Sequence, residues 1–359
     1  MVLKMIQEAI KKIVGGHSLS YEEACMAMES IMSGEATPAQ IGAFLTALRM
    51  KGETVMEIVA FASVMRKFCR RISPKVSGRL VDTCGTGGDQ IKTFNISTTA
   101  AFIVAGAGIP VAKHGNRSVT SKSGSADVLE KLGLNLNIEP EKVEEAIEKI
   151  GIGFMFAPIF HPAMKNVASI RKELGIRTVF NILGPLTNPA NARAQVIGVY
   201  EASLVEKIAE VLKGLGLEEA MVVHGLDGLD EISTIGITRV AWLRNGEVKI
   251  MELTPEDLGV KKASPEDITG LNPEESAELT FKILAGLTSR GDPKMDIALI
   301  NAAAGIIVAG KAEDFSYAME LAEESIKSGA AYKKLKELIR FCGGSKGGKL
   351  EELEIKYGC

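Results

Sequence analysis

The sequence has little cysteine, and its cysteines are not paired in any familiar motif. The five cysteines, at positions 25, 69, 84, 342 and 359, form no CxxC motif and no metal-ligand spacing with the four histidines. A zinc site or a disulfide framework is therefore not expected, and the pattern favours a reducing, cytoplasmic location. A bridge between Cys342 and Cys359, around the C-terminal segment, is the less favoured alternative.

Long apolar runs and an excess of one sign of charge are also lacking. No stretch reaches the roughly 18 unbroken apolar residues that a membrane helix requires, and the first residues predict an amphipathic helix and no export signal. The 42 Lys and Arg residues nearly balance the 45 Asp and Glu residues, for a formal net charge of −3. We therefore expect a soluble protein that binds small molecules and neither nucleic acid nor membranes.

Glycine, by contrast, is abundant. The chain has 37 glycines in 359 residues, or about 10%, where about 7% is usual. They follow no collagen-like period, so we expect them in turns and ligand-binding loops. With 46% hydrophobic and 24% charged residues, the chain has enough apolar surface to bury a large core.

The N-terminal part of the chain carries helix signals and almost no strand signals. Three capping boxes each precede an amphipathic run: Ser20 with Glu23, Thr37 with Gln40, and Thr54 with Glu57. We therefore predict that residues 1–72 form a small lobe of four α-helices.

From residue 79 onward, short β-rich runs alternate with helix-length segments, which predicts parallel strands joined by crossover helices. The runs lie at 79–83, 109–112, 153–157, 195–200 and 221–224, and the helical segments at 96–107, 141–150, 162–174 and 202–212. The Asn245-Gly246 dipeptide predicts an antiparallel hairpin. The fold class is therefore α/β, with a mixed, mainly parallel central sheet in a large domain over 73–359. Helices near 274–287, 294–309 and 312–341 close this domain, and a polar tail follows at 343–359.

The first candidate ligand site is the glycine-rich loop at 82–89, which follows a predicted strand and leads to a helix start at 93–98. Glycines let backbone N–H groups approach a bound anion, and the start of a helix adds donors and the positive end of its dipole. A phosphate or pyrophosphate would fit this loop. The alternative is an ordinary tight connection, since the loop is neither a Rossmann fingerprint nor a P-loop.

Two further candidates follow other predicted strands. The loop at 113–125 is rich in basic and hydroxyl side chains and is expected to hold phosphate, with a merely solvated basic loop as the alternative. Asp230 and Glu231 are adjacent carboxylates, which suit magnesium bridging a pyrophosphate; taken alone, they are more typical of an acidic surface turn, but next to two phosphate-type loops a magnesium site is favoured. No HExxH or GxSxG motif is present, so the sequence does not indicate zinc or nucleophile-elbow chemistry.

Together these motifs resemble those of the anthranilate phosphoribosyltransferase family. The resemblance rests on segments 85–89, 95–98, 113–117, 123–129, 167–178, 181–189 and 230–231, in this order over residues 1 to about 341. It implies a small helical lobe with a returning segment near 163–182, hinged to a large α/β domain that binds phosphoribosyl pyrophosphate, and a homodimer through the small lobes. It also implies that anthranilate and phosphoribosyl pyrophosphate give N-(5-phosphoribosyl)anthranilate and pyrophosphate in tryptophan biosynthesis, with Mg²⁺ as cofactor.

The resemblance also implies roles for individual residues. Phosphoribosyl pyrophosphate would contact Gly85, Thr86, Gly87, Gly88, Asp89, Thr93, Asn95, Ile96, Ser97, Thr98, Lys113, His114, Gly115, Asn116, Arg117, Ser118, Val119, Thr120, Ser121 and Ser125. Anthranilate would contact Gly85, Asn116, Arg171, His114 and His161, and magnesium would be held by Ser97, Asp230 and Glu231. An aromatic amine is a weak base that need not lose a proton before it attacks, so we expect electrostatic and positioning residues and no general acid or base.

One departure and two alternatives remain open. The family pattern has glycine directly after Asp89, whereas this chain has Gln90, with Lys92 close by; the loop is then stiffer or carries an extra cationic contact. A pyrimidine nucleoside phosphorylase would share the architecture but lack the pair Asp230 and Glu231. A non-catalytic, nucleic-acid-binding relative of the same fold would have a basic surface and a degraded phosphate loop, and this chain has neither.

Overall fold

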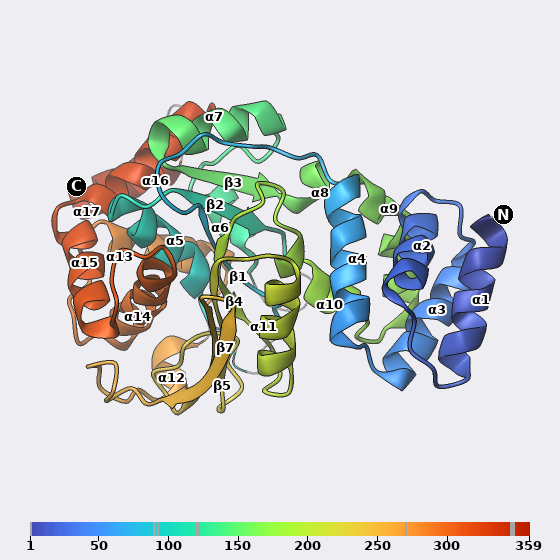
Figure 1. The fold of residues 1–359 in the computed structure, drawn as a ribbon. Helices are drawn as coiled ribbons and strands as arrows, with labels where there is room; N and C mark the ends of the chain where they lie inside the picture. The colour runs from blue at the N-terminus through green and yellow to red at the C-terminus, as the bar shows by residue number, and fades with distance from the viewer. Residues whose placement is uncertain (1, 89–90, 92, 119–122, 270, 345–348) are drawn as a thin grey trace.

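The structure is a computed structural model that describes residues 2–88, 91, 93–118, 123–269, 271–344 and 349–359. Six residues singled out from the sequence lie outside the described residues: Asp89, Gln90, Lys92, Val119, Thr120 and Ser121. A helical lobe containing the N-terminus stands beside a larger α/β body that contains the C-terminus (Figure 1).

The helical lobe follows the capping signals of the sequence. Its helices are α1 (Val2–Val14), α2 (Tyr21–Met32), α3 (Pro38–Lys51) and α4 (Val55–Phe68). All three predicted capping boxes are present, with Ser20, Thr37 and Thr54 each accepting the backbone N–H three residues on. Inside the lobe, the buried rings of Phe44 and Phe61 meet edge to face in a T-shaped contact, with centroids 5.9 Å apart.

The body is built on a mixed sheet with the order β3-β2-β1-β4-β5-β6-β7 among the described residues. The strands are β1 (Val81–Gly85), β2 (Val111–Gly115), β3 (Ile152–Phe156), β4 (Ala194–Gly198), β5 (Glu219–Gly225), β6 (Thr238–Arg244) and β7 (Glu247–Leu253). The first five pair in parallel, whereas β6 and β7 pair antiparallel. The predicted mixed, mainly parallel sheet is confirmed. The hairpin turn is confirmed as well, with φ of 53° at Asn245 and 77° at Gly246, as a type I′ turn requires.

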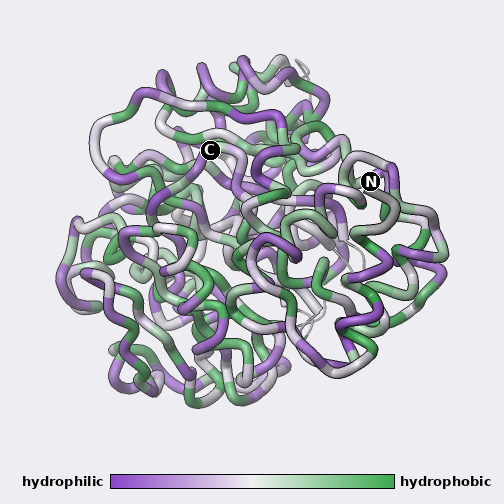
Figure 2. Tube along the Cα trace, turned by 45° about the vertical axis from the view of Figure 1, so that its right-hand side comes forward, coloured by the Kyte–Doolittle hydropathy of each residue, from purple (hydrophilic) through white to green (hydrophobic). Residues whose placement is uncertain are grey.

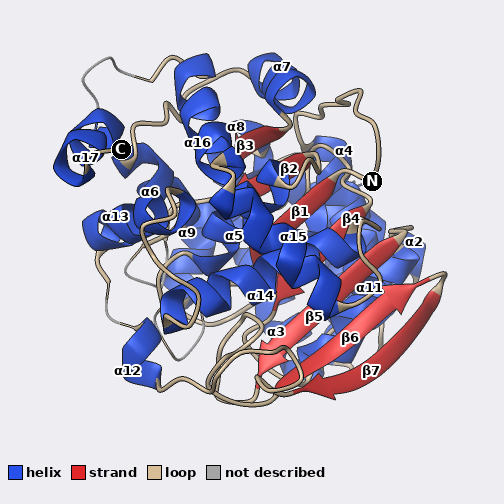
Figure 3. Cartoon of the chain, turned by 90° about the vertical axis from the view of Figure 1, so that its left-hand side faces the viewer, coloured by secondary structure: helices blue, strands red, loops and turns tan. Residues whose placement is uncertain are grey.

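Helices cover both faces of this sheet (Figure 3). The helices of the body are α5 (Ile96–Gly106), α6 (Ser125–Lys131), α7 (Pro140–Ile150), α11 (Leu204–Gly214), α12 (Pro265–Ile268), α13 (Pro273–Leu284), α14 (Pro293–Val308), α15 (Phe315–Lys327) and α16 (Ala330–Phe341). Helices α5 and α14 pack on each other and on β1, while α11 packs on β5 and β6 and also on α4 of the lobe. One buried apolar cluster therefore runs from the lobe across α11 to Ile197 and Val222 of the sheet. Figure 2 shows the resulting pattern, in which hydrophobic and hydrophilic segments interleave throughout both parts.

A segment of the body returns to the helical lobe. After β3 the chain forms α8 (Ala157–Phe160), a short 3₁₀ turn (Pro162–Met164), α9 (Lys165–Leu174) and α10 (Phe180–Leu183). Helix α9 packs on α3, and the Asn166 side-chain amide donates to the carbonyl of Met32 at 2.9 Å. This segment therefore contacts β3 of the body through α8 and helices α2 and α3 of the lobe through α9.

The C-terminal part differs from expectation at two points. The helical stretch predicted at 312–341 is two helices, α15 and α16, with Gly329 between them. The predicted polar tail contains α17 (Lys349–Tyr357), whose Leu350 and Leu353 are buried and whose Tyr357 hydroxyl donates to Glu278 of α13. All five cysteines, Cys342 and Cys359 included, are free. Within the described residues, no helix combines the length and apolar character needed to cross a membrane.

Candidate active site

The loops predicted to bind phosphate meet at one edge of the sheet. From β1 the strand order runs through β2 to β3 on one side and through β4 to β5 on the other. Such a reversal of direction leaves a crevice outside the carboxyl ends of the strands, where α/β proteins bind ligands. The strands end here at Gly85, Gly115, Gly198 and Gly225.

The start of α5 points the positive end of its dipole at this edge. Asn95 occupies the N-cap position without making a side-chain cap; its amide donates to the Ser123 carbonyl at 3.2 Å, and its side-chain oxygen accepts from Ser276 at 2.9 Å. Ile96 and Thr98 are almost fully buried, so they offer a ligand only backbone groups. Nearby, Thr93 makes an isolated backbone bridge to Thr269.

Lys113 lies beneath the glycine-rich loop, with only 3% of its surface exposed. Its Nζ donates to the carbonyl oxygen of Thr83 at 2.5 Å and lies 3.5 Å from Ser97 Oγ. Burial lowers the pKa of Lys113, and the nearby carboxylate of Asp82 opposes that shift. The amine of Lys113 is thus fixed beside the hydroxyl of Ser97.

Asp82, the first residue of the candidate loop at 82–89, was given no role of its own from the sequence, yet it organises the strands behind the site. It is fully buried; its Oδ1 accepts the backbone N–H of His114, and its Oδ2 accepts the side-chain amides of Asn188 and Gln195 at 2.7 and 3.2 Å. Burial raises the pKa of Asp82. The 181–189 motif therefore has a structural role, because Asn188 links β1 to β2 through Asp82 and through the carbonyl of Ala112.

The second loop is held mainly by contacts with α6. The Asn116 carbonyl accepts from the Ser125 hydroxyl at 3.3 Å, and the Ser118 backbone N–H donates to Asp127 at 3.1 Å. Arg117 pairs with Asp127 at 3.0 Å and with Glu130 at 2.7 Å. The charge of Arg117 is therefore engaged on α6, while Asn116 and Ser118 stay near the end of β2.

The two carboxylates after β5 reach the other loops. Asp230 Oδ2 accepts the backbone N–H of Gly87 at 2.9 Å, and Glu231 Oε1 accepts the backbone N–H of Ser97 at 3.1 Å. The approach is close: a Cβ on Gly85 would lie 2.7 Å from Asp230 Oδ2, and one on Gly198 would lie 1.5 Å from the Asp230 carbonyl. Burial raises the pKa of Asp230, and the hydrogen bond from the Gly87 backbone opposes that shift.

These residues fit magnesium bound together with a phosphate ligand. Ser97, Asp230 and Glu231 offer only hard oxygen donors, and the glycine at 85 leaves room beside Asp230. No group of three or more His, Cys, Asp or Glu side chains among the described residues forms a metal cage by itself. Mg²⁺ typically takes one or two carboxylates and fills its other positions with water and phosphate oxygens, so the donor set suits it.

An arginine that was not singled out from the sequence joins the returning segment to the glycine-rich loop. Arg177 Nη2 donates to the Gly88 carbonyl at 2.7 Å, and its guanidinium lies 4.0 Å from the centroid of the Tyr200 ring. The Tyr200 backbone N–H in turn donates to the hydroxyl of Thr86 at 3.1 Å. Arg177 belongs to the 167–178 motif, so that motif was the sequence signal from which its role could have been predicted.

Two neutral histidines stand at the junction of the body and the returning segment. The rings of His114 and His161 are 4.9 Å apart between centroids, and each has a buried Nε2 atom without a hydrogen-bond partner. Burial lowers the pKa of His161 to about 4 and that of His114 well below its ordinary value. Both imidazoles are therefore uncharged at neutral pH.

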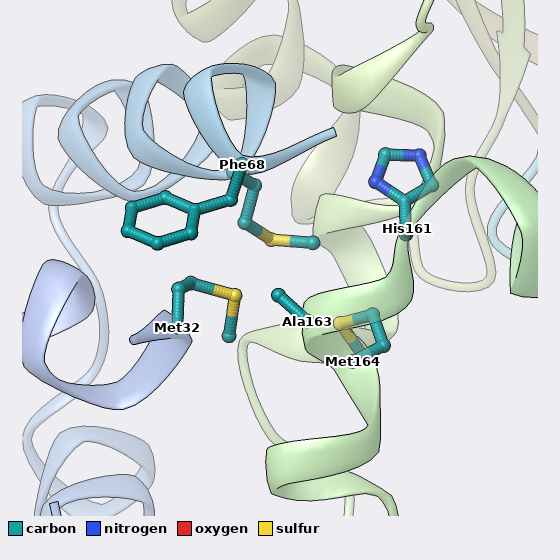
Figure 4. Close-up of a pocket in the computed structure, with 6 residues that line it drawn as sticks. Met32, Phe68, His161, Ala163 and Met164 are labelled. Carbon is teal, nitrogen blue, oxygen red and sulfur yellow. The ribbon is translucent and has the colours of Figure 1, made fainter. Parts of the chain in front are cut away.

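His161 also borders a small apolar hollow beside the helical lobe. The hollow is lined by Met32, Met65, Phe68, His161, Ala163 and Met164. Figure 4 shows Phe68 and Met32 on the side of the lobe, facing His161, Ala163 and Met164 on the returning segment. One side of the site is thus mostly hydrophobic.

Arg171 belongs to the same returning segment as His161. It lies on α9, with its guanidinium 5.5 Å from the centroid of the Phe180 ring, and burial lowers its pKa. No carboxylate of the described residues lies within ion-pair distance of it. Arg171 is thus available for a carboxylate ligand.

Known protein families and sequences match this chain over most of its length. Residues 7–69 match the model of the helical bundle domain of a glycosyl transferase family, and residues 77–332 match the model of its a/b domain. The anthranilate phosphoribosyltransferases of Acetivibrio thermocellus and Methanocorpusculum labreanum are each 54% identical to this chain. The alignments cover 94% and 95% of this chain and 96% and 99% of those proteins.

Solved structures agree with the sequence comparison. The crystal structure of anthranilate phosphoribosyltransferase from Thermus thermophilus superposes with a TM-score of 0.88 at 44% identity, covering 93% of this chain and 99% of that one. The Saccharomyces cerevisiae enzyme in complex with phosphoribosyl pyrophosphate and Mg superposes with a TM-score of 0.86 at 29% identity, covering 94% and 97%. Since the identity exceeds one half over nearly the full length of the curated relatives, this chain belongs to the anthranilate phosphoribosyltransferase family.

Proposed function

We propose that this protein transfers the 5-phosphoribosyl group of phosphoribosyl pyrophosphate to the amine of anthranilate, with pyrophosphate as the second product, in tryptophan biosynthesis. The observation that carries the proposal is the meeting of Asp230, Glu231 and the start of α5 at the glycine-rich loop, next to Lys113. Among the relatives, the yeast enzyme has been solved with phosphoribosyl pyrophosphate and Mg, and separately with 4-fluoroanthranilate. These relatives favour this reaction over a pyrimidine nucleoside phosphorylase or a nucleic-acid-binding relative.

The phosphate groups would be held by the loops that end β1 and β2. Backbone N–H groups of the glycine-rich loop and of the first turn of α5 are the natural donors, and Lys113 supplies a fixed positive charge. We keep all the residues named from the sequence as contacts of phosphoribosyl pyrophosphate. Within this set, Ile96 and Thr98 would act through their backbone groups, and Arg117 would shape the loop by its pairing with α6. Donors that are fixed before the ligand arrives need no reorganisation when charge develops on the leaving pyrophosphate.

Magnesium would be held by Asp230, Glu231 and Ser97 together with the pyrophosphate. When bound, it neutralises charge that builds up on the leaving group. The chain's own part is to fix the two carboxylates: the backbone N–H groups of Gly87 and Ser97 orient them toward the phosphate loops.

The acceptor would be positioned from the returning segment. Arg171 is the residue for the anthranilate carboxylate, because its guanidinium is partly desolvated and has no carboxylate partner among the described residues. Gly85, Asn116 and the neutral rings of His114 and His161 would form the wall around the aromatic amine. An arylamine attacks an electron-poor ribose carbon without prior loss of a proton, so positioning is the main demand on these residues.

Two wider expectations belong to this proposal. The small lobe, residues 1–72 with 163–182, exposes the apolar side chains Val14, Met50 and Met56, with 71%, 83% and 56% of their surface accessible, and we propose that it mediates a homodimer. We also propose a cytoplasmic location, which five unpaired cysteines support.

The test is to incubate the protein with anthranilate, phosphoribosyl pyrophosphate and Mg²⁺ and to follow the loss of anthranilate fluorescence. A parallel reaction with EDTA measures the part that depends on the metal, and one with uridine and inorganic phosphate tests phosphorylase activity. We expect loss of fluorescence only with both substrates and Mg²⁺. No magnesium-dependent loss, or phosphorolysis of uridine, would contradict the proposal.

A further inference from the structure

Hydrogen bonds between residues of the same loop stabilise the turn that carries Asp230 and Glu231. The Ser233 hydroxyl donates to Asp227 Oδ2 at 2.6 Å and accepts the backbone N–H of Ile235 at 2.9 Å. The Leu229 backbone N–H donates to Asp227 Oδ1 at 3.2 Å. These bonds shape the turn, but they do not attach it to the rest of the body.

Besides the contacts of Asp230 and Glu231 with Gly87 and Ser97, the loop is attached to the body by a side chain on α14. Asn301 is buried, with 2% of its surface exposed, on a helix whose other buried residues are mainly apolar. Its Oδ1 accepts the backbone N–H of Ile232 at 2.9 Å, and its Nδ2 donates to the carbonyls of Ile232 at 3.0 Å and of Ile297 at 2.9 Å. One side-chain amide thus engages both backbone groups of the residue that directly follows Glu231.

The two hydrogen bonds between Asn301 and Ile232 form a clamp next to the proposed magnesium site. Asn301 lines the same small cavity as Glu231, Ser97 and Thr83. While Ile232 is held in place, the carboxylate of Glu231 accepts the backbone N–H of Ser97. Without Asn301, the buried N–H and C=O groups of Ile232 would lose their hydrogen-bond partners, which favours a shift of the backbone around Ile232 and Glu231.

We propose that Asn301 is a positioning residue for the magnesium-binding pair: by clamping Ile232 it holds Glu231, and next to it Asp230, in the orientation that binds the metal with pyrophosphate. This inference rests on the proposed function. Asn301 does not touch the substrate or the metal in this account; it acts through the backbone of one residue.

The test compares Asn301→Leu, of similar size but without hydrogen bonds, with Asn301→Asp, which keeps the acceptor and loses the donor. Ser325→Ala is the matched control, because Ser325 is equally buried and its hydroxyl donates to the Ile103 carbonyl on the helical face far from the metal loop. Asn301→Asp serves as the second variant if Asn301→Leu does not fold.

The first measurement is amide hydrogen exchange over residues 226–236 without any ligand. We expect faster exchange in both Asn301 variants and no change in Ser325→Ala. The second is calorimetric binding of phosphoribosyl pyrophosphate with Mg²⁺ and with EDTA. We expect the affinity with Mg²⁺ to fall about tenfold, the size typical of losing a residue that orients metal ligands, and the affinity with EDTA to stay within about twofold of the wild-type value.

Three outcomes would overturn the inference: unchanged exchange in the Asn301 variants, an equal loss of affinity with and without Mg²⁺, or the same losses in Ser325→Ala. A wild-type protein that binds phosphoribosyl pyrophosphate equally with Mg²⁺ and with EDTA would instead contradict the proposed function. The exchange experiment contains no ligand, so it separates the two failures.

Discussion

The two sides of the site differ in whether their titratable side chains have hydrogen-bond or ion-pair partners. On the phosphate side, formed by the carboxyl ends of β1, β2 and β5 and the start of α5, Lys113, Asp230 and Glu231 are hydrogen-bonded to backbone groups of β1, the glycine-rich loop and α5 respectively. On the acceptor side, formed by residues 157–183 with His114, two buried histidine nitrogens have no partner and Arg171 has no carboxylate partner among the described residues. The three charged side chains of the phosphate side thus have partners before ligand binds, whereas on the acceptor side two histidine nitrogens have no hydrogen-bond partner and Arg171 has no carboxylate partner among the described residues.

The chemistry of the proposed ligands explains this difference. A pyrophosphate carries many charged oxygens, and binding it strongly requires donors that are already fixed in place. Anthranilate offers an aromatic ring, one carboxylate and one amine, so an apolar wall with a few polar groups is sufficient. The comparison predicts that changes on the phosphate side impair catalysis most, and that changes on the acceptor side act on one substrate only.

The largest effect is expected from Asp230→Ala combined with Glu231→Ala. Turnover at saturating Mg²⁺ should fall at least about 100-fold, because stabilisation of the leaving pyrophosphate is lost. Stability should fall modestly, since the N–H groups of Gly87 and Ser97 lose their acceptors. Steady-state kinetics and urea unfolding measure the two effects, with the exposed Glu256→Ala as control. Retention of more than about a tenth of wild-type turnover would refute the assignment, because it corresponds to less than ~1.4 kcal/mol.

The next effect is expected from Arg171→Ala. The KM for anthranilate should rise about 10–100-fold, the size of a lost charge-assisted pair of ~1.5–3 kcal/mol. Binding of phosphoribosyl pyrophosphate should stay nearly unchanged, since the phosphate side does not use this residue. Calorimetric titration of each ligand decides the point, with Lys172→Ala, an exposed neighbour on α9, as the matched control. An equal loss of affinity for both ligands would mean that Arg171 stabilises the contact between the lobes and does not bind the carboxylate of anthranilate.

Local sequence signals predicted the parts of this structure that depend on neighbouring residues. The capping boxes, the alternation of strands and helices and the hairpin at Asn245 are decided within a few residues of the chain, and each is confirmed. The same signals placed the glycine-rich loop and the pair Asp230 and Glu231 at strand ends, and the structure brings them together.

Long-range pairing could not be predicted in this way. Asp82 finds its partners Asn188 and Gln195 at separations of 106 and 113 residues, which no local pattern encodes. The close packing around Asp230 is equally long-range, because it comes from the backbone of β4 and of the glycine-rich loop. In α17, the apolar contacts of Leu350 and Leu353 with distant helices stabilise a helix where composition alone indicated a polar tail.

A smaller effect is expected from His161→Leu on stability at acid pH. The folded-state pKa of His161 is lowered to about 4, below the unfolded value of about 6.5. Between these values the unfolded chain binds the proton and the folded chain does not, so this histidine makes stability fall as pH drops from 6.5 to 4. The variant should therefore lose less stability across this window than the wild type.

Urea unfolding at about pH 7, 5.5 and 4.5 measures this difference, and the slope with pH is compared rather than the absolute stability. The exposed His17→Leu, the same substitution outside the site, is the matched control. A wild-type slope in His161→Leu would show that His161 is not held neutral, and the acceptor side would then not differ from the phosphate side in charge.

The smallest effect is expected from Arg177→Gln, which tests whether the two sides are connected. Arg177 belongs to the returning segment, yet it bonds the Gly88 carbonyl and stacks on Tyr200. Because Arg177 is exposed, water can replace much of this contact, and a cation over a ring at such a site contributes only ~0.5–1 kcal/mol. The KM for phosphoribosyl pyrophosphate should rise no more than about threefold, and amide exchange at residues 85–88 should increase.

A double-mutant cycle with Tyr200→Leu measures the contact itself. If Arg177 acts by stacking on Tyr200, the two substitutions together should destabilise the protein less than the sum of the two single effects. The KM for anthranilate should stay at its wild-type value in all three variants, because the unmet polar groups of the acceptor side are untouched. A rise in that KM equal to the rise for phosphoribosyl pyrophosphate would show that Arg177 couples the two sides, and the separation drawn between them would have to be abandoned.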